Sequence, residues 1–225
     1  MNPEPSTVRS VRLRGDLDEP LSRWLWLVKW ILAIPHYIVL LFLWIAFWAV
    51  TVVAWFAILF TGRYPRSLFD FSVGVMRWSW RVQFYTYAAL GTDRYPPFTL
   101  RQTDYPTDLE IDYPEQLSRG LALVKWWLLA IPHYLILAAL FSGGVVLGNG
   151  SGNGNNTIPL IGVLVLIAAV ALLFTGRYPR GLFGFVLGVN RWFYRVLAYS
   201  ALLTDDYPPF RLDQGPREPI EDVVP

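Results

Sequence analysis

The sequence LFTGRYPR occupies residues 59–66 and returns unchanged at residues 173–180. Each copy closes a long stretch without Lys, Arg, Asp or Glu, from Trp30 to Gly62 and from Trp126 to Gly176. Both stretches exceed the roughly 20 apolar residues that span the hydrocarbon core of a bilayer. Gly permits a tight turn and Pro stiffens the chain after it, so the block predicts where an apolar helix ends at a membrane surface.

The block belongs to a larger internal repeat. Five further blocks recur in the same order: LSR at 21–23 and 117–119, VKW at 28–30 and 124–126, AIPHY at 33–37 and 130–134, RWxxRV at 77–82 and 191–196, and YPPF at 95–98 and 207–210. Six shared blocks in one order indicate a duplication. The sequence therefore predicts a first module at residues 1–100, a second at 101–214 and a disordered tail at 215–225.

The composition is typical of a membrane protein. Of the 225 residues, 54% are hydrophobic and 16% are charged, and the mean hydropathy is +0.37, which is more apolar than an ordinary globular domain. The chain contains no Cys, which excludes disulfides, thiolate metal sites and Cys nucleophiles. The net charge of +2 is too small to indicate nucleic-acid binding.

The order of the repeated blocks resembles that of a known family. The pattern VKW, AIPHY, LFTGRYPR, RWxxR and DxYPPF is similar to the bacterial membrane proteins grouped as domain of unknown function 4389, and it covers most of both modules. The resemblance implies a polytopic membrane protein and brings no established activity, catalytic residue or ligand. The copies differ at one charged position, where Asp70 of the first module corresponds to Gly184 of the second.

The uncharged stretches predict the membrane topology. In the second module, a Gly- and Asn-rich loop at residues 148–156 divides the stretch and indicates a hairpin of two membrane helices. In the first, the aromatic cluster at residues 42–48 indicates a tighter hairpin, because aromatic residues gather at the bilayer interface. Each helix of that hairpin would be near the lower limit for spanning, and a re-entrant hairpin would satisfy the same charges.

The positions of the cations favour two hairpins over one long tilted span in the first module. A single span would place Arg63 to Lys125 opposite the N-terminal arginines, whereas two hairpins leave every Lys and Arg on one side. The positive-inside rule then predicts a multi-pass protein with both termini in the cytoplasm. The family resemblance implies that the membrane is the bacterial inner membrane.

A third segment follows each LFTGRYPR block, at residues 67–90 and 181–202. In the first module Arg66, Asp70, Arg77 and Arg81 fall on one face of a helix that is otherwise apolar. This pattern predicts an amphipathic helix lying in the interface plane. The alternative is a third membrane span with its arginines facing protein or water.

Short alternating segments predict a small cytoplasmic sheet that joins the modules. They lie at residues 11–14, 98–100, 109–112 and 210–213. Pairing of the first with the third would bring Arg12 and Arg14 close to Glu110 and Asp112. The fold predicted from the sequence is thus an all-α integral membrane protein with two tandem repeats, each a transmembrane hairpin plus an interfacial helix, and short strands.

The repeated LFTGRYPR blocks supply the strongest candidate site. Each places two arginines around a tyrosine at the expected headgroup depth, and guanidinium groups bind phosphate bidentately. The candidate lipid-binding residues are Arg63, Tyr64, Arg66, Arg177, Tyr178 and Arg180. The alternative is that these arginines only anchor the orientation of the helices.

The secondary candidates are eight polar residues at equivalent positions of the two modules: Lys29 and Lys125, His36 and His133, Arg77 and Arg191, and Arg81 and Arg195. The lysines are expected to extend their ammonium groups to the interface, or to bind a lipid phosphate. The histidines follow a proline and are expected to bond a freed backbone carbonyl. A metal or proton site is the alternative, although no carboxylate accompanies them.

The sequence contains no phosphate loop, nucleophile elbow or His-Glu metal motif, so an enzyme is the least supported class and no cofactor is indicated. We expect a non-catalytic accessory or scaffold subunit that binds anionic lipid and other membrane subunits. The alternative is a small transporter or channel with its path between the repeats.

Overall fold

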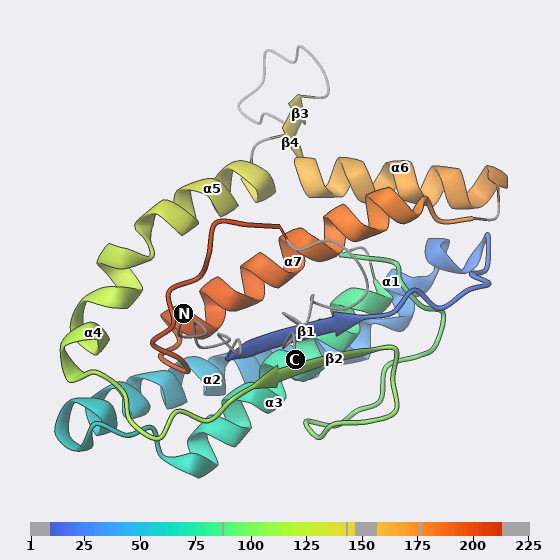
Figure 1. Ribbon diagram of the computed structural model, residues 1–225. Helices are drawn as coiled ribbons and strands as arrows, with labels where there is room; N and C mark the ends of the chain where they lie inside the picture. The colour runs from blue at the N-terminus through green and yellow to red at the C-terminus, as the bar shows by residue number, and fades with distance from the viewer. Residues whose placement is uncertain (1–9, 87, 143, 147–156, 176, 213–225) are drawn as a thin grey trace, which may run out of the picture.

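The computed structural model describes residues 10–86, 88–142, 144–146, 157–175 and 177–212, and its secondary structure is mostly helical (Figure 1). Two helical stretches, Ile34–Thr61 and Arg119–Leu140, are long and apolar enough to cross a membrane. The predicted tail and the predicted loop at 148–156 lie outside the described residues.

The two modules follow the same order of elements. The first consists of β1 (Val11–Gly15), η1 (Leu25–Leu27), α1 (Lys29–Leu32), α2 (Ile34–Thr61) and α3 (Arg66–Tyr85). The second consists of β2 (Thr107–Ile111), α4 (Arg119–Val124), η2 (Lys125–Leu129), α5 (Ile131–Ser142), β3 (Gly144–Val146), β4 (Thr157–Pro159), α6 (Leu160–Thr175) and α7 (Arg180–Ser200).

Helix α2 is continuous, so the hairpin predicted for the first module is wrong. It runs for 28 residues, about 42 Å at 1.5 Å per residue. The aromatic cluster packs between helices instead of marking a turn: Trp44 Nε1 donates to Ser79 Oγ at 3.0 Å, and Phe47 is fully buried. The cluster contains no Gly, Pro or Asn that would break the helix.

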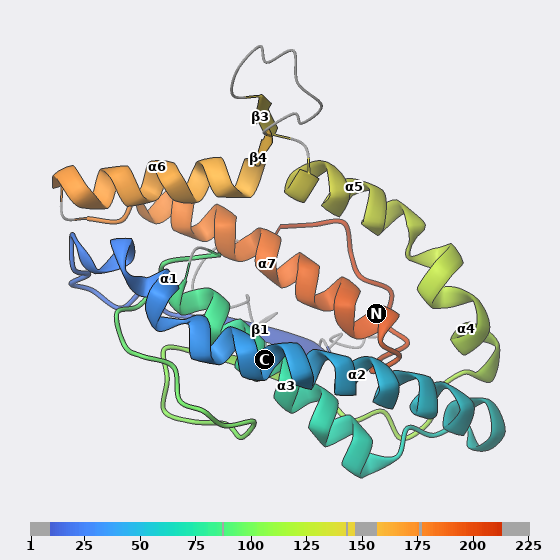
Figure 2. The same cartoon turned by 180° about the vertical axis from the view of Figure 1, so that it is seen from behind.

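The second module contains the same long helix with an insertion in it. Helices α5 and α6 have 12 and 16 residues, which together equal the length of α2. The antiparallel pair β3–β4 lies between them. Figures 1 and 2 show α6 continuing away from α5 instead of folding back along it, so the second predicted hairpin is also wrong.

A π-helix absorbs a one-residue difference between the modules. Three residues separate Lys29 from Ala33, whereas four separate Lys125 from Ala130. The extra residue lies in η2, whose π-helical geometry keeps the flanking lysine and histidine in equivalent places.

Helices α3 and α7 form the centre of the molecule, which corrects their prediction as interfacial helices. Both are buried along most of their length (Figure 2). Arg81 is 1% exposed and Arg191 is fully buried. The LFTGRYPR turn folds α3 back onto α2, and the strands and the other module cover much of its remaining surface. Arg77 and Arg81 of its basic stripe therefore face protein, whereas Arg66 and Asp70 at its start are exposed.

The predicted pairing of the first and third alternating segments is confirmed. Strands β1 and β2 are antiparallel, and Arg12 donates to Asp112 at 2.8 Å. The other two predicted strands are wrong in their described part: residues 98–100 and 210–212 are irregular, with bends at 98, 100 and 210. Their phenylalanines instead pack against the histidines of α2 and α5.

The sheet relates the modules by an approximate twofold axis. Leu13 pairs with Leu109, and these residues occupy equivalent places in the two repeats, 96 positions apart like LSR at 21–23 and 117–119. Each strand accepts a hydrogen bond from the central helix of the other module. Arg77 of α3 donates from Nε to the Leu109 carbonyl at 2.9 Å, and Arg191 of α7 donates from Nε to the Leu13 carbonyl at 3.0 Å.

Candidate functional site

A buried lysine begins each module's long helical run. Lys29 Nζ lies 2.8 Å from Asp93 Oδ1 and donates to the Thr92 carbonyl at 2.7 Å. Its ammonium also lies 5.0 Å from the centre of the Tyr85 ring. Burial lowers the pKa of Lys29, and the hydrogen bond to Asp93 opposes that shift.

The second module repeats this arrangement. Lys125 Nζ lies 2.7 Å from Asp205 Oδ1, donates to the Thr204 carbonyl at 2.8 Å and faces the ring of Tyr199. Neither lysine extends to the surface, so the prediction that they do is wrong. Each ammonium neutralises a carboxylate that also accepts a backbone N–H from the LSR block, at Ser22 or Ser118.

Each histidine lies in an aromatic cage. Trp78 Nε1 donates to His36 Nδ1 at 3.2 Å, and Trp192 Nε1 donates to His133 Nδ1 at 3.2 Å. The Phe98 ring stacks on His36 with a centroid distance of 3.9 Å, and Phe210 stacks on His133 at 4.2 Å. The expected bond to a carbonyl is therefore wrong: each histidine accepts a hydrogen bond from an indole N–H.

The indole bond fixes the chemical state of the imidazole. Because Nδ1 accepts from tryptophan, the ring is neutral and carries its proton on Nε2. Both Nε2 atoms are buried and have no hydrogen-bond partner among the described residues. No group of three or more His, Cys, Asp or Glu side chains that could hold a metal ion occurs in the described part of the chain.

The arginines of the central helices bind protein oxygens. Arg77 Nε lies 3.1 Å from Asp108 Oδ1, and Arg81 donates to the Thr103 hydroxyl and the Thr99 carbonyl. Burial and nearby Arg77 lower the pKa of Arg81 to about 10, so it remains charged at neutral pH. Arg191 and Arg195 are buried as well. The structure thus places these secondary candidates inside the protein, away from headgroups.

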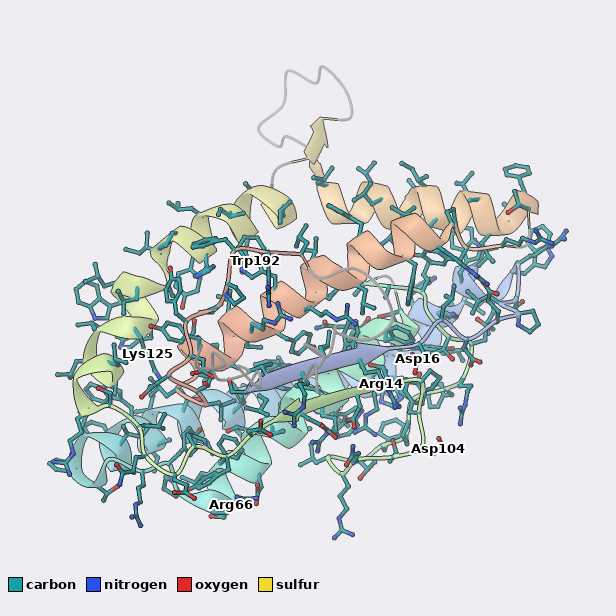
Figure 3. All side chains as sticks on the ribbon, viewed as in Figure 1. Arg14, Asp16, Arg66, Asp104, Lys125 and Trp192 are labelled. Atoms are coloured by element: carbon teal, nitrogen blue, oxygen red, sulfur yellow. The ribbon has the colours of Figure 1, made fainter. Side chains whose placement is uncertain are left out.

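The first LFTGRYPR turn has exposed arginines around a buried tyrosine. Gly62 takes the left-handed conformation, with φ of 71°, and ends α2. Arg63 and Arg66 are exposed. Arg66 lies 3.2 Å from Asp70 and 4.6 Å from the Tyr113 ring centre (Figure 3). Tyr64 is fully buried beside the Ser72 hydroxyl at 3.3 Å, which corrects its predicted place among headgroups.

The described residues of the second turn have fewer internal partners than those of the first. Tyr178 is 3% exposed, so it lies beneath the surface that carries the arginines, and its role in lipid binding stays a prediction. Arg177 is exposed, and the side chain of Arg180 is 85% exposed with its guanidinium 3.5 Å from Glu19. A cavity of about 680 Å³ adjoins this turn. Its lining includes Glu19, Pro20, Leu21, Ala171, Leu172, Thr175, Arg177, Tyr178, Pro179 and Arg180.

The two turns lie at opposite ends of the molecule, each beside the start of the other module (Figure 1). The Leu117 amide donates to the Gly62 carbonyl at 2.8 Å, and the Tyr113 hydroxyl donates to the Tyr64 carbonyl at 2.6 Å. At the second turn, Glu19 and Leu21 from the start of the first module line the adjoining cavity, which is the equivalent neighbourhood. The structure therefore brings together the arginines within a turn and keeps the two turns apart.

An apolar groove lies between the modules. It encloses about 780 Å³ and is lined by Trp48, Thr51, Val52, Trp55, Phe56, Trp126, Trp127, Tyr134, Ser200 and Leu202. One side is α2 of the first module, and the other is η2 and α5 of the second. The lining contains hydroxyl and indole groups and no charged side chain, so the groove suits a hydrocarbon chain better than an ion.

Sequence reasoning missed the partners of the lysines and histidines. Asp93 and Asp205 lie 64 and 80 residues beyond their lysines, too far for a local pattern to reveal. The signal that could have found them was the repeated DxYPPF block, which supplies both the carboxylate and the stacked phenylalanine. Each block wraps the start of its own module's long helix.

The comparisons with known proteins identify one family. The model for the domain of unknown function DUF4389 matches residues 23–99 and 159–211. The chain belongs to this family, and the two matched segments are consistent with two tandem copies. No curated protein and no solved structure matches the chain.

Proposed function

We propose that this DUF4389 protein is a non-catalytic protein of the bacterial inner membrane that holds anionic lipid headgroups at its LFTGRYPR turns and assembles with other membrane proteins. The observation that carries the proposal is the exposed apolar surface of the long helices. Leu41, Phe42 and Ile45 of α2 are 60–66% exposed. Leu135 of α5 is 67% exposed, and Phe174 of α6 is 78% exposed. Soluble proteins rarely expose a contiguous apolar patch of more than a few hundred Å².

The arrangement of α2 supports immersion in lipid. Its buried residues, including His36, Leu40, Phe47 and Ala54, form one stripe, while the remaining faces are apolar and exposed. A helix that is hydrophobic all round needs either a protein cover or lipid around it. The exposed arginines of both modules follow directly after such helices, at the depth where headgroup phosphates would lie.

The strand pairing bears on topology. Residues 11–15 pair with residues 107–111, and the Ser10 hydroxyl lies 3.0 Å from that of Thr204. We therefore propose that the segments before and after each module's long helices share one side of the membrane. An even number of crossings in each module, or re-entrant helices, satisfies this requirement, which supports our proposal that both termini are cytoplasmic.

The transporter alternative gains little support from the groove between the modules. An ion or polar solute would require polar or charged groups along its path, whereas seven of the ten lining residues are Trp, Val, Phe or Leu. The same surface could take a lipid chain or the helix of a partner subunit. We therefore retain the scaffold function as the proposal.

The experiment compares two fourfold variants with the wild type. In one variant Lys replaces each of four arginines, and in the other Gln replaces the same four: Arg63, Arg66, Arg177 and Arg180. Lys keeps the charge without the planar fork, and Gln loses both. Native mass spectrometry after purification in gentle detergent should show retained anionic lipid that falls modestly in the Lys variant and steeply in the Gln variant. Equal lipid retention by wild type and the Gln variant, with correct membrane insertion, would refute headgroup binding.

A further inference from the structure

The duplicated turns have diverged in their internal contacts. In the first turn Arg66 has two partners within the protein, the Asp70 carboxylate and the Tyr113 ring. The equivalent positions of the second turn are Gly184 and Leu17, which offer neither a charge nor an aromatic face. Arg180 retains a contact of 3.5 Å with Glu19.

The hydrogen bonding of the turn's tyrosine also differs between the modules, with fewer internal partners in the second. The Tyr64 hydroxyl lies 3.3 Å from Ser72 Oγ. In the second module the residue equivalent to Ser72 is Val186. The Tyr178 hydroxyl is buried and has no hydrogen-bond partner among the described residues. Such a group carries a free-energy cost, which a bound acceptor would remove.

The second turn also adjoins a cavity of mixed character. Arg177, Arg180 and Thr175 supply cationic and hydroxyl groups, and Leu21, Ala171 and Leu172 supply an apolar wall. This combination matches a molecule with an anionic head and a hydrocarbon tail. Glu19 places a carboxylate beside Arg180, in the place that a phosphate group would take.

We propose that the second turn is the specific, tighter site for one phosphate-bearing anionic lipid, and that the first turn, whose Arg66 and Tyr64 have partners within the protein, holds headgroups more weakly. This inference rests on the proposed function and deepens it. The phosphate would bind Arg177 and Arg180 and accept a hydrogen bond from Tyr178, with the acyl chain along Leu172. Glu19 would be displaced from Arg180 when the lipid binds.

The duplication supplies a matched control for the test. Arg177 and Arg180 are replaced together by Gln in one variant, and Arg63 and Arg66 in the other. Both proteins are reconstituted in nanodiscs of phosphatidylcholine with a small fraction of phosphatidylglycerol, and bound lipid is counted by native mass spectrometry. We expect at least about a fivefold loss of retained phosphatidylglycerol in the first variant and a clearly smaller loss in the second.

The tyrosines give a second readout that a purely structural role would not produce. Tyr178→Phe removes an unpaired hydroxyl, so it should leave the unfolding temperature in lipid-free detergent unchanged or slightly higher. It should reduce the rise in unfolding temperature on addition of phosphatidylglycerol. Tyr64→Phe should do the reverse, lowering stability in detergent through loss of the Ser72 bond and leaving the lipid effect intact.

The outcomes separate this inference from the proposed function. Equal losses in the two Arg-to-Gln pairs would keep headgroup binding and overturn the assignment to the second turn, as would a loss confined to the first turn. No loss in either pair would overturn both. Inorganic phosphate that protects the protein as well as phosphatidylglycerol does, in detergent without lipid, would overturn the lipid as the ligand.

Discussion

At the scale of single residues, Lys29 and Lys125 show how the ends of a module are joined. Each ammonium binds a carboxylate from the DxYPPF segment, and that carboxylate also binds the LSR block. The position of each lysine within an apolar run was visible in the sequence. Its partner was not, because a pairing across more than 60 residues depends on how the chain folds back.

Replacing Lys29 with Met should lower the free energy of unfolding by about 3 kcal/mol, because it leaves the Asp93 carboxylate without its ion pair. Asp93 is partly hydrated, with 24% of its side chain exposed, so the cost lies at the lower end for such pairs. Adding Asp93→Asn, which keeps an acceptor for the Ser22 amide, should restore much of the loss. Thermal unfolding in detergent, followed by circular dichroism, measures both effects.

The matched variants at Lys125 and Asp205 should show the same pattern, since the second module repeats the contacts. Full additivity of the single substitutions in either module would contradict a direct ion pair.

At the scale of elements, charge patterning located the helices and failed on their connections. The ends of α2 agree with the uncharged stretch and with the glycine at position 62. That α2 is one continuous helix could not be predicted. Its tryptophans donate to Ser79 and to the Ala122 carbonyl, but in the sequence they look the same as tryptophans at a bilayer interface. The arginine stripe of α3 was also correctly located, but its acceptors are carbonyls of distant segments.

Deletion of residues 143–159 should fuse α5 and α6 into one helix of the length of α2. The deletion removes 17 residues and restores the residue spacing of the first module, so every retained side chain keeps its equivalent position. The protein should fold with a higher helical fraction and an unchanged or higher unfolding temperature.

Circular dichroism of the purified deletion variant measures both quantities. A matched deletion of 16 residues, 144–159, should be less stable, because one extra residue rotates α6 by about 100° relative to α5. Loss of folding in the 17-residue deletion alone would show that the insertion is needed to bend the helix.

At the scale of the whole molecule, the modules are intertwined, although the sequence suggested consecutive units. Each strand packs under the other module's central helix, and each turn contacts the start of the other module. The duplication was evident in the sequence, and so was the pairing of Arg12 with acidic residues. The packing of each strand under the other module's central helix was not evident in the sequence. Repeated blocks show which residues of the two modules are equivalent, and they do not show which residues are in contact.

The charges of the strands direct this arrangement. Arg12 and Arg14 occupy the positions at which the second module has Asp108 and Glu110, so the two strands attract each other. Residues 1–102 expressed alone should not form a stable symmetric dimer, because the same register would place Arg12 opposite Arg14. Sedimentation of that fragment tests this, and a variant with Arg12→Asp, which restores opposite charges, should dimerise more tightly. A stable dimer of the unaltered fragment would contradict the account.

The central claim is that the exposed faces of the long helices lie in lipid. The chain has no Cys, so a nitroxide can be placed singly by substitution at Val52 or Ile45 of α2 and at Glu110 of the sheet. Electron paramagnetic resonance of the protein in phosphatidylglycerol-containing vesicles then compares collision with oxygen, which concentrates in hydrocarbon, and with a water-soluble nickel chelate. We expect the labels on α2 to meet oxygen and avoid the chelate, and the label on the sheet to show the opposite. Labels at Val52 and Ile45 that meet the chelate as readily as the label at Glu110 would contradict a membrane location for α2.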